Sequence, residues 1–479
     1  MDKAALLRDT LQNLSVREVL ALARTLELVR AQGKEQLPTD LLLQSMRPRL
    51  REARATRVPT LCRLACGVFE DFLTDRDDDP RVPGLVARAA IRPWWRGLLR
   101  LRAKEMDALE KRLAMLYAAP KFDADSFVRE VQAECVTGTG MLIAELNKPH
   151  ADAALRQLFG NRRLIDDLQE MANLLGVAEP LMAARVAIDA VLDSVGKREK
   201  RLILELTPEA VTVAKQHHLA ISEKHGLNAR YVALGVLNRL AQPSQVLRIG
   251  RALSWKPNAA MVRDTEFGVV GERLILDLQR LARDILTRFC GRRSVPDLTA
   301  LSAALTHYMD EAEGLLGELG FHRDSAWGEA ILETRVALGE AMDRDFLGRI
   351  AEQAILDTIL PVERRQKNRV ATPDPDLSAA PHPAAGEAAV VAARFLMLLV
   401  QRGTRHGLAQ ATRATIDRLG EEIADRTGNL VDALRAQPAN PVIEAQIQAA
   451  VGVLNTLFED GRGELLARRM RVANQVSAA

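Results

Sequence analysis

Apolar residues recur every three or four positions through long stretches of this chain, and this spacing constrains the fold more than any other feature. The pattern is clearest between residues 298 and 319, where the apolar positions are Leu298, Leu301, Leu305, Tyr308, Ala312, Leu315 and Leu319. Side chains three and four residues apart lie on one face of an α-helix. Aromatic residues, which strands favour, make up only 4% of the chain. The sequence therefore predicts an all-α protein.

Helix boundaries are marked by capping residues. Ser15 and Glu18 have the spacing of a capping box, in which each side chain bonds the backbone N–H of the other residue. Thr207 and Pro208 predict the start of a helix that ends at Gly226. Between residues 203 and 360 the predicted helices form pairs joined by short turns. This pairing suggests a multi-helix array of HEAT-like antiparallel pairs, although no consensus repeats at a fixed period.

One segment interrupts the helical pattern. Residues 362–387 contain four prolines and almost no large apolar side chain, so we expect a flexible linker that tethers a C-terminal helical bundle. The expected organisation is an N-terminal helical segment (1–82), a main helical array (83–361), the Pro-rich linker (362–387) and a three-helix bundle (388–479). The helices of that bundle are predicted at residues 388–410, 412–436 and 440–472.

Composition indicates the compartment. The N-terminus lacks the apolar core of a signal peptide. The most apolar run, residues 388–400, contains Arg394 and is shorter than the roughly 20 residues that span a bilayer. We expect no transmembrane segment. Without a signal peptide or a transmembrane segment, we expect the protein to be cytoplasmic. The excess of Ala and Arg is typical of a GC-rich genome, so we also expect it to be bacterial. The formal net charge of +3 over 479 residues gives no reason to expect a polyanionic partner.

Three of the eight histidines fall within residues 215–226. His218 and His225 share one helix face but lie about 10 Å apart along the axis, too far to bind one metal ion together. No histidine pair in the chain has i,i+4 spacing, and Glu-x-x-His is absent. We expect His218 to be a hydrogen-bonded, partly buried residue. A metal site assembled from distant helices, with His307 or His322 as ligands, stays open.

No cofactor or catalytic motif is recognisable. The four cysteines include no C-x-x-C pair, and we expect them to be reduced thiols. Gly138 and Gly140 lie between two predicted helical stretches, without the strand and the Gly-Lys-Ser/Thr that a phosphate loop requires. Small residues at such a position favour close helix packing. Gly-x-Ser-x-Gly, the commonest serine-hydrolase motif, is absent. We therefore expect no cofactor, no metal and no catalytic residue.

Two arginine clusters are the strongest candidates for contact with a partner or an anion. The first is in residues 47–57 and the second, which includes two tryptophans, is in residues 88–104. Basic side chains beside large amphipathic rings suit an acidic protein groove, nucleic-acid phosphates or an anionic membrane surface. Pro93 is expected to separate Arg92 from the following helix. The candidate contact residues are Arg47, Arg49, Arg51, Arg54, Arg57, Arg96, Arg100, Lys104, Trp94 and Trp95.

Taken together, these features predict a non-catalytic cytoplasmic helical scaffold or adaptor that binds other proteins. Amphipathic helices, a tethered terminal bundle and the lack of a catalytic motif favour this interpretation. The first alternative is binding of nucleic acid or an anionic surface through the arginines of residues 47–57 and 88–104. The second is an all-helical enzyme whose site draws residues from several helices. For Trp94 and Trp95, a role as core anchors at a helix junction competes with partner contact.

Overall fold

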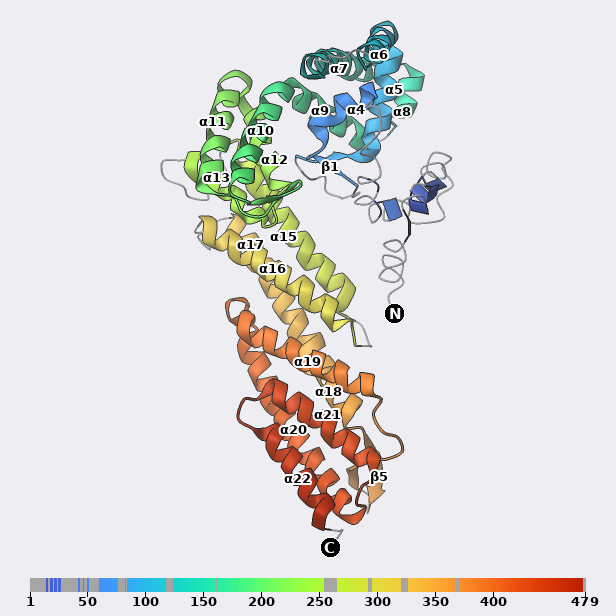
Figure 1. The fold of residues 1–479 in the computed structure, drawn as a ribbon, viewed down its shortest axis with the longest axis vertical. Coiled ribbons are helices and arrows are strands. Elements are labelled where there is room, and N and C mark those ends of the chain that lie inside the picture. The colour runs from blue at the N-terminus through green and yellow to red at the C-terminus, as the bar shows by residue number, and fades with distance from the viewer. Residues whose placement is uncertain are drawn as a thin grey trace. The chain divides into compact units, whose positions relative to one another are not determined.

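The computed structural model is helical over most of the residues that it describes, so the all-α prediction is confirmed (Figure 1). The described residues are 14–15, 18–19, 21–23, 25–26, 42–43, 46, 50, 60–75, 82, 84–117, 124–150, 152–160, 162–253, 265–291, 295–319, 326–367 and 370–476. The chain divides into two units. One comprises Met1–Pro257 and Met261–Arg273, and the other Asn258–Ala260 and Leu274–Ala479.

The first unit opens with short elements around a buried aromatic group. At residue 15, the backbone N–H donates to Glu18 Oε2 at 2.7 Å, as the capping box predicts. Phe69 and Trp94 then form the aromatic part of the core, with ring centroids 5.5 Å apart. The elements of this half are α4 (Leu61–Ala65), η1 (Cys66–Phe69), β1 (Leu73–Thr74) paired in parallel with β2 (Val86–Ala87), η2 (Arg88–Ala90), α5 (Ile91–Leu101), α6 (Ala103–Tyr117), α7 (Ala124–Leu146), α8 (Ala153–Leu158) and α9 (Arg162–Gly176).

The rest of this unit consists of helices and one short hairpin. Its elements are α10 (Ala178–Ser194), the antiparallel strands β3 (Arg198–Glu199) and β4 (Leu202–Ile203), α11 (Pro208–His225), η3 (Gly226–Ala229), α12 (Arg230–Leu237), η4 (Pro243–Val246) and α13 (Leu247–Leu253). The boundaries predicted for α11 are confirmed. The Thr207 side chain accepts from the backbone N–H of Ala210, and Gly226 at the C-cap has a φ of +53°.

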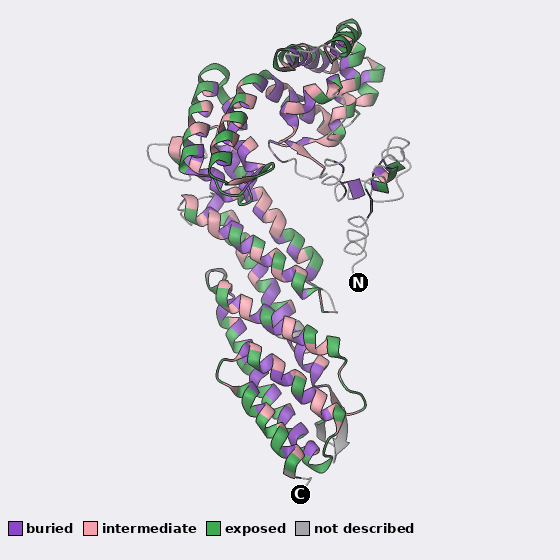
Figure 2. Cartoon of the chain, in the orientation of Figure 1, coloured by how far each residue is buried: buried purple, intermediate pink, exposed green. Residues whose placement is uncertain are grey.

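The second unit begins within α15 (Gly268–Phe289) and continues through α16 (Leu298–Leu319), α17 (Ala326–Ala341), the π-helix η5 (Met342–Ile350) and α18 (Ala351–Ile359). On α16, the residues of the predicted apolar face are buried from Leu298 to Leu315. Figure 2 shows the same one-sided burial on neighbouring helices. The HEAT-like array is not confirmed, because the described helices between residues 203 and 360 range from 7 residues in α13 to 22 in α15 and α16.

A β-hairpin and the start of a helix occupy the predicted linker. β5 (Val362–Lys367) pairs antiparallel with β6 (Val370–Pro375), with Val362 opposite Pro375 and Lys367 opposite Val370. The low apolar content of this segment predicts a flexible linker, but a two-stranded ladder satisfies backbone polar groups without a large apolar face. Proline is tolerated there because both strands of an isolated pair are edge strands. α19 (Pro383–Arg402) then begins five residues before the predicted helix.

The C-terminal bundle contains four helices where the sequence predicts three. α19 is followed by η6 (Gly403–His406), α20 (Ala409–Ala436), α21 (Pro441–Leu457) and α22 (Arg462–Val476). The third predicted helix is interrupted at residues 458–461, where Gly461 has a φ of +79°. A left-handed glycine of this kind ends a helix without a Cβ clash. Leu396 of α19, Leu434 of α20 and Ile447 of α21 are fully buried in this bundle.

Candidate functional site

The predicted basic ridge is divided between two helices. Pro93 lies in the first turn of α5, where its missing N–H disrupts no helical hydrogen bond, so Arg92 and Arg96 belong to the same helix. The expectation that Pro93 separates them is wrong. α5 instead ends at Arg102, whose φ and ψ of −126° and 40° are not helical, and Lys104 lies in α6. Arg96, Arg100 and Lys104 therefore do not share one continuous helix.

Arg100 has a structural partner. Its guanidinium Nη2 lies 2.7 Å from Asp152 Oδ2, and the other carboxylate oxygen accepts from the backbone N–H of Ala154 at the start of α8. These donors hold the pKa of Asp152 below its usual range, with Arg100 as the main cause. Arg96 and Lys104 are exposed. The anion-binding role of the ridge stays a prediction, with Arg100 engaged in joining α5 to α8.

The two tryptophans of α5 have different environments. Trp94 is fully buried and donates its Nε1–H to Thr139 Oγ1 of α7 at 2.9 Å. Its ring has no face open to a partner. Trp95 is half-buried, with its ring centroid 5.8 Å from that of Trp94. The five candidate arginines of residues 47–57 lie outside the described residues: Arg47, Arg49, Arg51, Arg54 and Arg57.

The histidine cluster is mainly part of the scaffold. His218 forms the predicted polar contact, since its Nε2 lies 3.0 Å from Glu266 Oε1, and at 1% exposure it is more buried than the partly buried residue that the sequence predicts. His225 is exposed in the last turn of α11. Among the residues that the structure describes, no group of three or more His, Cys, Asp or Glu side chains has the arrangement of a metal site.

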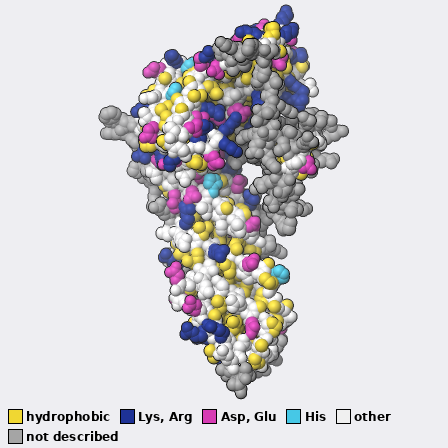
Figure 3. All heavy atoms as spheres, viewed as in Figure 1, with side chains coloured by type: hydrophobic (Ala, Val, Ile, Leu, Met, Phe, Trp, Pro, Cys, Tyr) yellow, Lys and Arg dark blue, Asp and Glu magenta, His cyan; other side chains and the backbone are white. Residues whose placement is uncertain are grey.

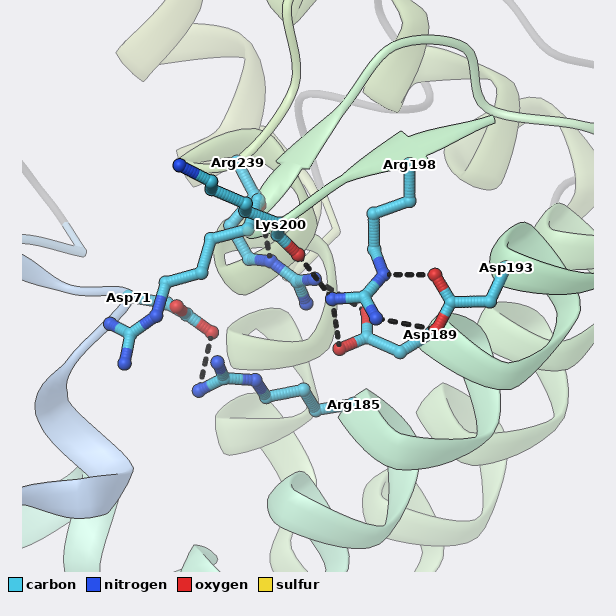
Figure 4. Close-up of polar contacts among 8 residues, drawn as sticks. Asp71, Arg185, Asp189, Asp193, Arg198, Lys200 and Arg239 are labelled. Carbon is cyan, nitrogen blue, oxygen red and sulfur yellow. Dashed lines mark hydrogen bonds and ion pairs between the residues drawn. The ribbon is translucent and has the colours of Figure 1, made fainter. Parts of the chain in front are cut away.

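A network of arginines and aspartates connects several elements of the first unit (Figure 4). Arg239, just after α12, is 6% exposed and pairs with Asp189 of α10. Arg198 of β3 reaches the same carboxylate at 3.5 Å and also pairs with Asp193. In Figure 4, Arg198 and Arg239 approach Asp189 from the hairpin side. Buried charges of this kind are stable only when they are paired.

The same network borders a small cavity. Asp71, between η1 and β1, lies 3.0 Å from the guanidinium of Arg185 on α10. Burial raises the pKa of Asp71 above its usual value, although Arg185 opposes the rise. A carboxyl with a raised pKa in a cavity is a common sign of an active site. This cavity, however, measures about 20 Å³, which accommodates about one water molecule. The network therefore joins elements of the first unit through ion pairs and does not form a substrate site.

A larger hollow lies between α19 and α21 in the C-terminal bundle. This α19/α21 groove has a volume of about 620 Å³ and is open to solvent. Its floor consists of small side chains: a Cβ added to Gly386 would lie 3.7 Å from the Cβ of Ala449, and one added to Gly452 would lie 3.5 Å from Val390. The groove is lined by Pro381, His382, Pro383, Gly386, Glu387, Val390, Val391, Arg394, Ala445, Gln448, Ala449 and Gly452.

The polar groups of the groove lie at its rim. Glu387 and Arg394 of α19 and Gln448 of α21 are all exposed. Neither Glu387 nor Arg394 forms an ion pair with another described residue. His382 is used at the start of α19, where its Nδ1 accepts from the backbone N–H of Ala384. The groove therefore combines an apolar floor with one anionic and one cationic side chain that have no partner within the described part of the chain.

α19 is also unusually apolar for a helix that is only partly covered. Within the described ranges it is the one helix with the length and hydropathy to cross a membrane, and a single such helix is weak evidence for a span. Its most apolar 18-residue window has a mean hydropathy of 1.6, and only 33% of that window is buried. Ala389, Ala392 and Leu396 face the bundle core, whereas Val390 and Val391 face the groove. Figure 3 shows hydrophobic side chains reaching the surface between charged ones.

Comparison with known proteins identifies no family. No protein-family model matches the chain, and no curated protein and no solved structure matches it either. The feature of the chain that points to a function is therefore the groove, with the chemistry of its lining.

The groove is absent from the sites that the sequence predicts. Residues 388–400 stand out there only as an apolar run shorter than a bilayer span, and the small residues of α21 form no recognisable motif. A signal is nevertheless present, because Glu387, Val390, Val391 and Arg394 have the three- and four-residue spacing of one helix face. Their proximity to α21 cannot be read from sequence, since nothing in the spacing identifies which helices are neighbours.

Proposed function

We propose that the protein is a non-catalytic, cytoplasmic helical scaffold that binds a polypeptide in the α19/α21 groove. The observation that carries this proposal is the open groove of about 620 Å³, with an apolar floor and, among the described residues, unpaired charges at its rim. An amphipathic helix buries its apolar face in such a groove, with anchoring side chains at intervals of three and four residues. Charged side chains at the rim select the partner more than they add affinity.

The lining favours a polypeptide over a small molecule. Small-molecule sites bring a few polar groups together inside a mainly enclosed apolar pocket. Here Glu387, Arg394 and Gln448 are exposed at the rim, and the apolar lining consists of Gly, Ala, Val and Pro residues. Small floor residues allow a second helix backbone to approach closely. A helix with small or β-branched apolar side chains and one charge of each sign fits this surface.

Site-specific photo-cross-linking in the native host tests the proposal. A benzophenone amino acid at Gln448 should yield a covalent adduct with a polypeptide. Ala445→Phe, which fills the groove from its α21 wall, should reduce the yield of that adduct by about tenfold, because the added ring clashes with an incoming helix. The same amino acid at Glu421, on the exposed side of α20, is the matched control and should give little adduct. Equal yields at Gln448 with and without Ala445→Phe would show that the groove is not a binding site.

A further inference from the structure

We propose that the occupant of the groove is α19 of a second copy of this chain, in antiparallel orientation. This inference rests on the proposed function, since it names the partner of the same groove. The resulting dimer would have a two-fold axis, and the α19 of each copy would lie in the α19/α21 groove of the other. Homodimers of this kind need a surface that is complementary to itself, so that when residue i contacts residue j, residue j also contacts residue i.

The charges on α19 meet this requirement. Glu387 and Arg394 are seven residues apart, which is nearly two helical turns, so both lie on the groove face about 10 Å apart along the axis. The point midway between them falls between Val390 and Val391. Two antiparallel copies of α19 that cross at this point place each Glu387 opposite the Arg394 of its partner. Both rim charges are then neutralised at once.

The apolar residues support the same arrangement. Val390 and Val391 are half-buried and line the groove. In the proposed dimer they would lie nearest the two-fold axis, with Val390 beside Gly452 of its own chain. On the α21 side, Ala445, Ala449 and Gly452 also line the groove, and their small size limits how far they project into it. Contact with a second copy would also cover exposed apolar surface of α19. Only 33% of the most apolar window of this helix is buried within one chain. Burial of apolar surface supplies most of the driving force for association.

The test uses the full-length chain and its charge-swapped variants in analytical ultracentrifugation over a range of concentrations. The wild-type protein should reach twice the chain mass of 52.8 kDa. Glu387→Arg places a guanidinium against the partner's Arg394 at two symmetry-related points, and Arg394→Glu places a carboxylate against the partner's Glu387. Each single variant should weaken dimerisation by about tenfold or more, because like charges that face each other repel. Circular dichroism should show unchanged helicity, since both side chains are exposed.

Two rescue experiments distinguish this interface from any other. The double variant Glu387→Arg/Arg394→Glu restores opposite charges in reversed positions, so its dimerisation constant should return to within about threefold of the wild type. A mixture of the two single variants should form heterodimers, because each carries the charge that the other lacks. A charge swap elsewhere, such as Glu421→Arg on α20, should leave dimerisation unchanged.

Three outcomes would overturn the inference. They are a wild-type chain that stays monomeric at about 100 µM, single swaps without effect on dimerisation, and single variants that do not associate when mixed. A monomeric chain that still gives the groove-dependent adduct at Gln448 would leave the proposed function intact and refute only the second copy as occupant. If no adduct forms at Gln448 and the charge swaps leave the dimerisation constant unchanged, both the proposed function and the second copy as occupant are refuted.

Discussion

Trp94 shows how a single side chain can fix the crossing of two helices. Its indole is fully buried, contacts Phe69 edge to face, and donates to the hydroxyl of Thr139. That hydroxyl in turn donates to the carbonyl oxygen of Cys135 at 2.6 Å. The only polar atom of the indole is therefore satisfied inside the core, as buried polar groups must be. Of the two roles that the sequence leaves open for Trp94, this environment supports the core anchor and not the partner contact.

Trp94→Phe should destabilise the first unit. The change leaves a cavity and removes the hydrogen bond to Thr139, and together these cost about 2–3 kcal/mol of unfolding free energy. Trp95→Phe is the matched control on the next residue, and its half-buried ring should cost less than about 1 kcal/mol. Urea unfolding followed by circular dichroism measures both. Equal losses for the two variants would contradict the assigned role of Trp94.

Between elements, glycine sets how closely α5 and α7 approach each other. A Cβ on Gly138 of α7 would lie 2.6 Å from a methyl carbon of Leu98, and a Cβ on Gly97 of α5 would lie 2.8 Å from one of Leu142. Both leucines are buried and cannot move freely. Gly140, two residues along the same helix, has no atom within 4 Å of an added Cβ. The predicted role of small residues in helix packing thus applies to Gly138 and not to Gly140.

Gly138→Leu and Gly140→Leu should therefore have opposite effects. At residue 138 the larger side chain separates α5 from α7, and such overpacking costs about 1–3 kcal/mol. At residue 140 leucine enters open space, and its higher helix propensity should add up to about 1 kcal/mol to the unfolding free energy. Thermal unfolding of the two variants compares them directly. A stabilised Gly138→Leu protein would show that α5 and α7 are not in close contact there.

Local sequence signals predicted the elements that depend on local forces. The cap at Thr207, the end at Gly226 and the apolar face of α16 follow from contacts within one helix, and all three are present. The sequence does not predict the β5–β6 hairpin. Hydrogen bonds between its two strands satisfy the backbone although the segment has few apolar side chains, and no single residue indicates that the two strands pair. The α19/α21 groove was missed because it depends on two helices that are separated by α20 in the chain.

At the scale of the whole molecule, the chain divides into two compact units. A boundary between these units lies between Arg273 and Leu274, within α15. The domain boundary that the sequence predicts near residue 361 stays a prediction. Each unit has its own fully buried leucines, for example Leu168 of α9 in the first and Leu396 of α19 in the second. Units with separate cores can lose stability separately.

Leu168→Ala and Leu396→Ala should each destabilise only the unit that contains the substitution. Removal of a fully buried leucine side chain costs about 2–5 kcal/mol. Hydrogen exchange read by mass spectrometry should then accelerate in helices α9 and α10 for Leu168→Ala, and in α20 and α21 for Leu396→Ala. Faster exchange throughout the chain in either variant would indicate one cooperative structure instead of two.

The seven-residue separation of Glu387 and Arg394 also has a consequence for gene duplication. If one paralogue acquired Glu387→Arg and the other Arg394→Glu, each would repel its own kind and attract the other. Two substitutions would thus convert a self-recognising chain into an obligate pair, with both helices unchanged in length and register. Evolution could in this way change which chains assemble without redesigning the fold that carries them.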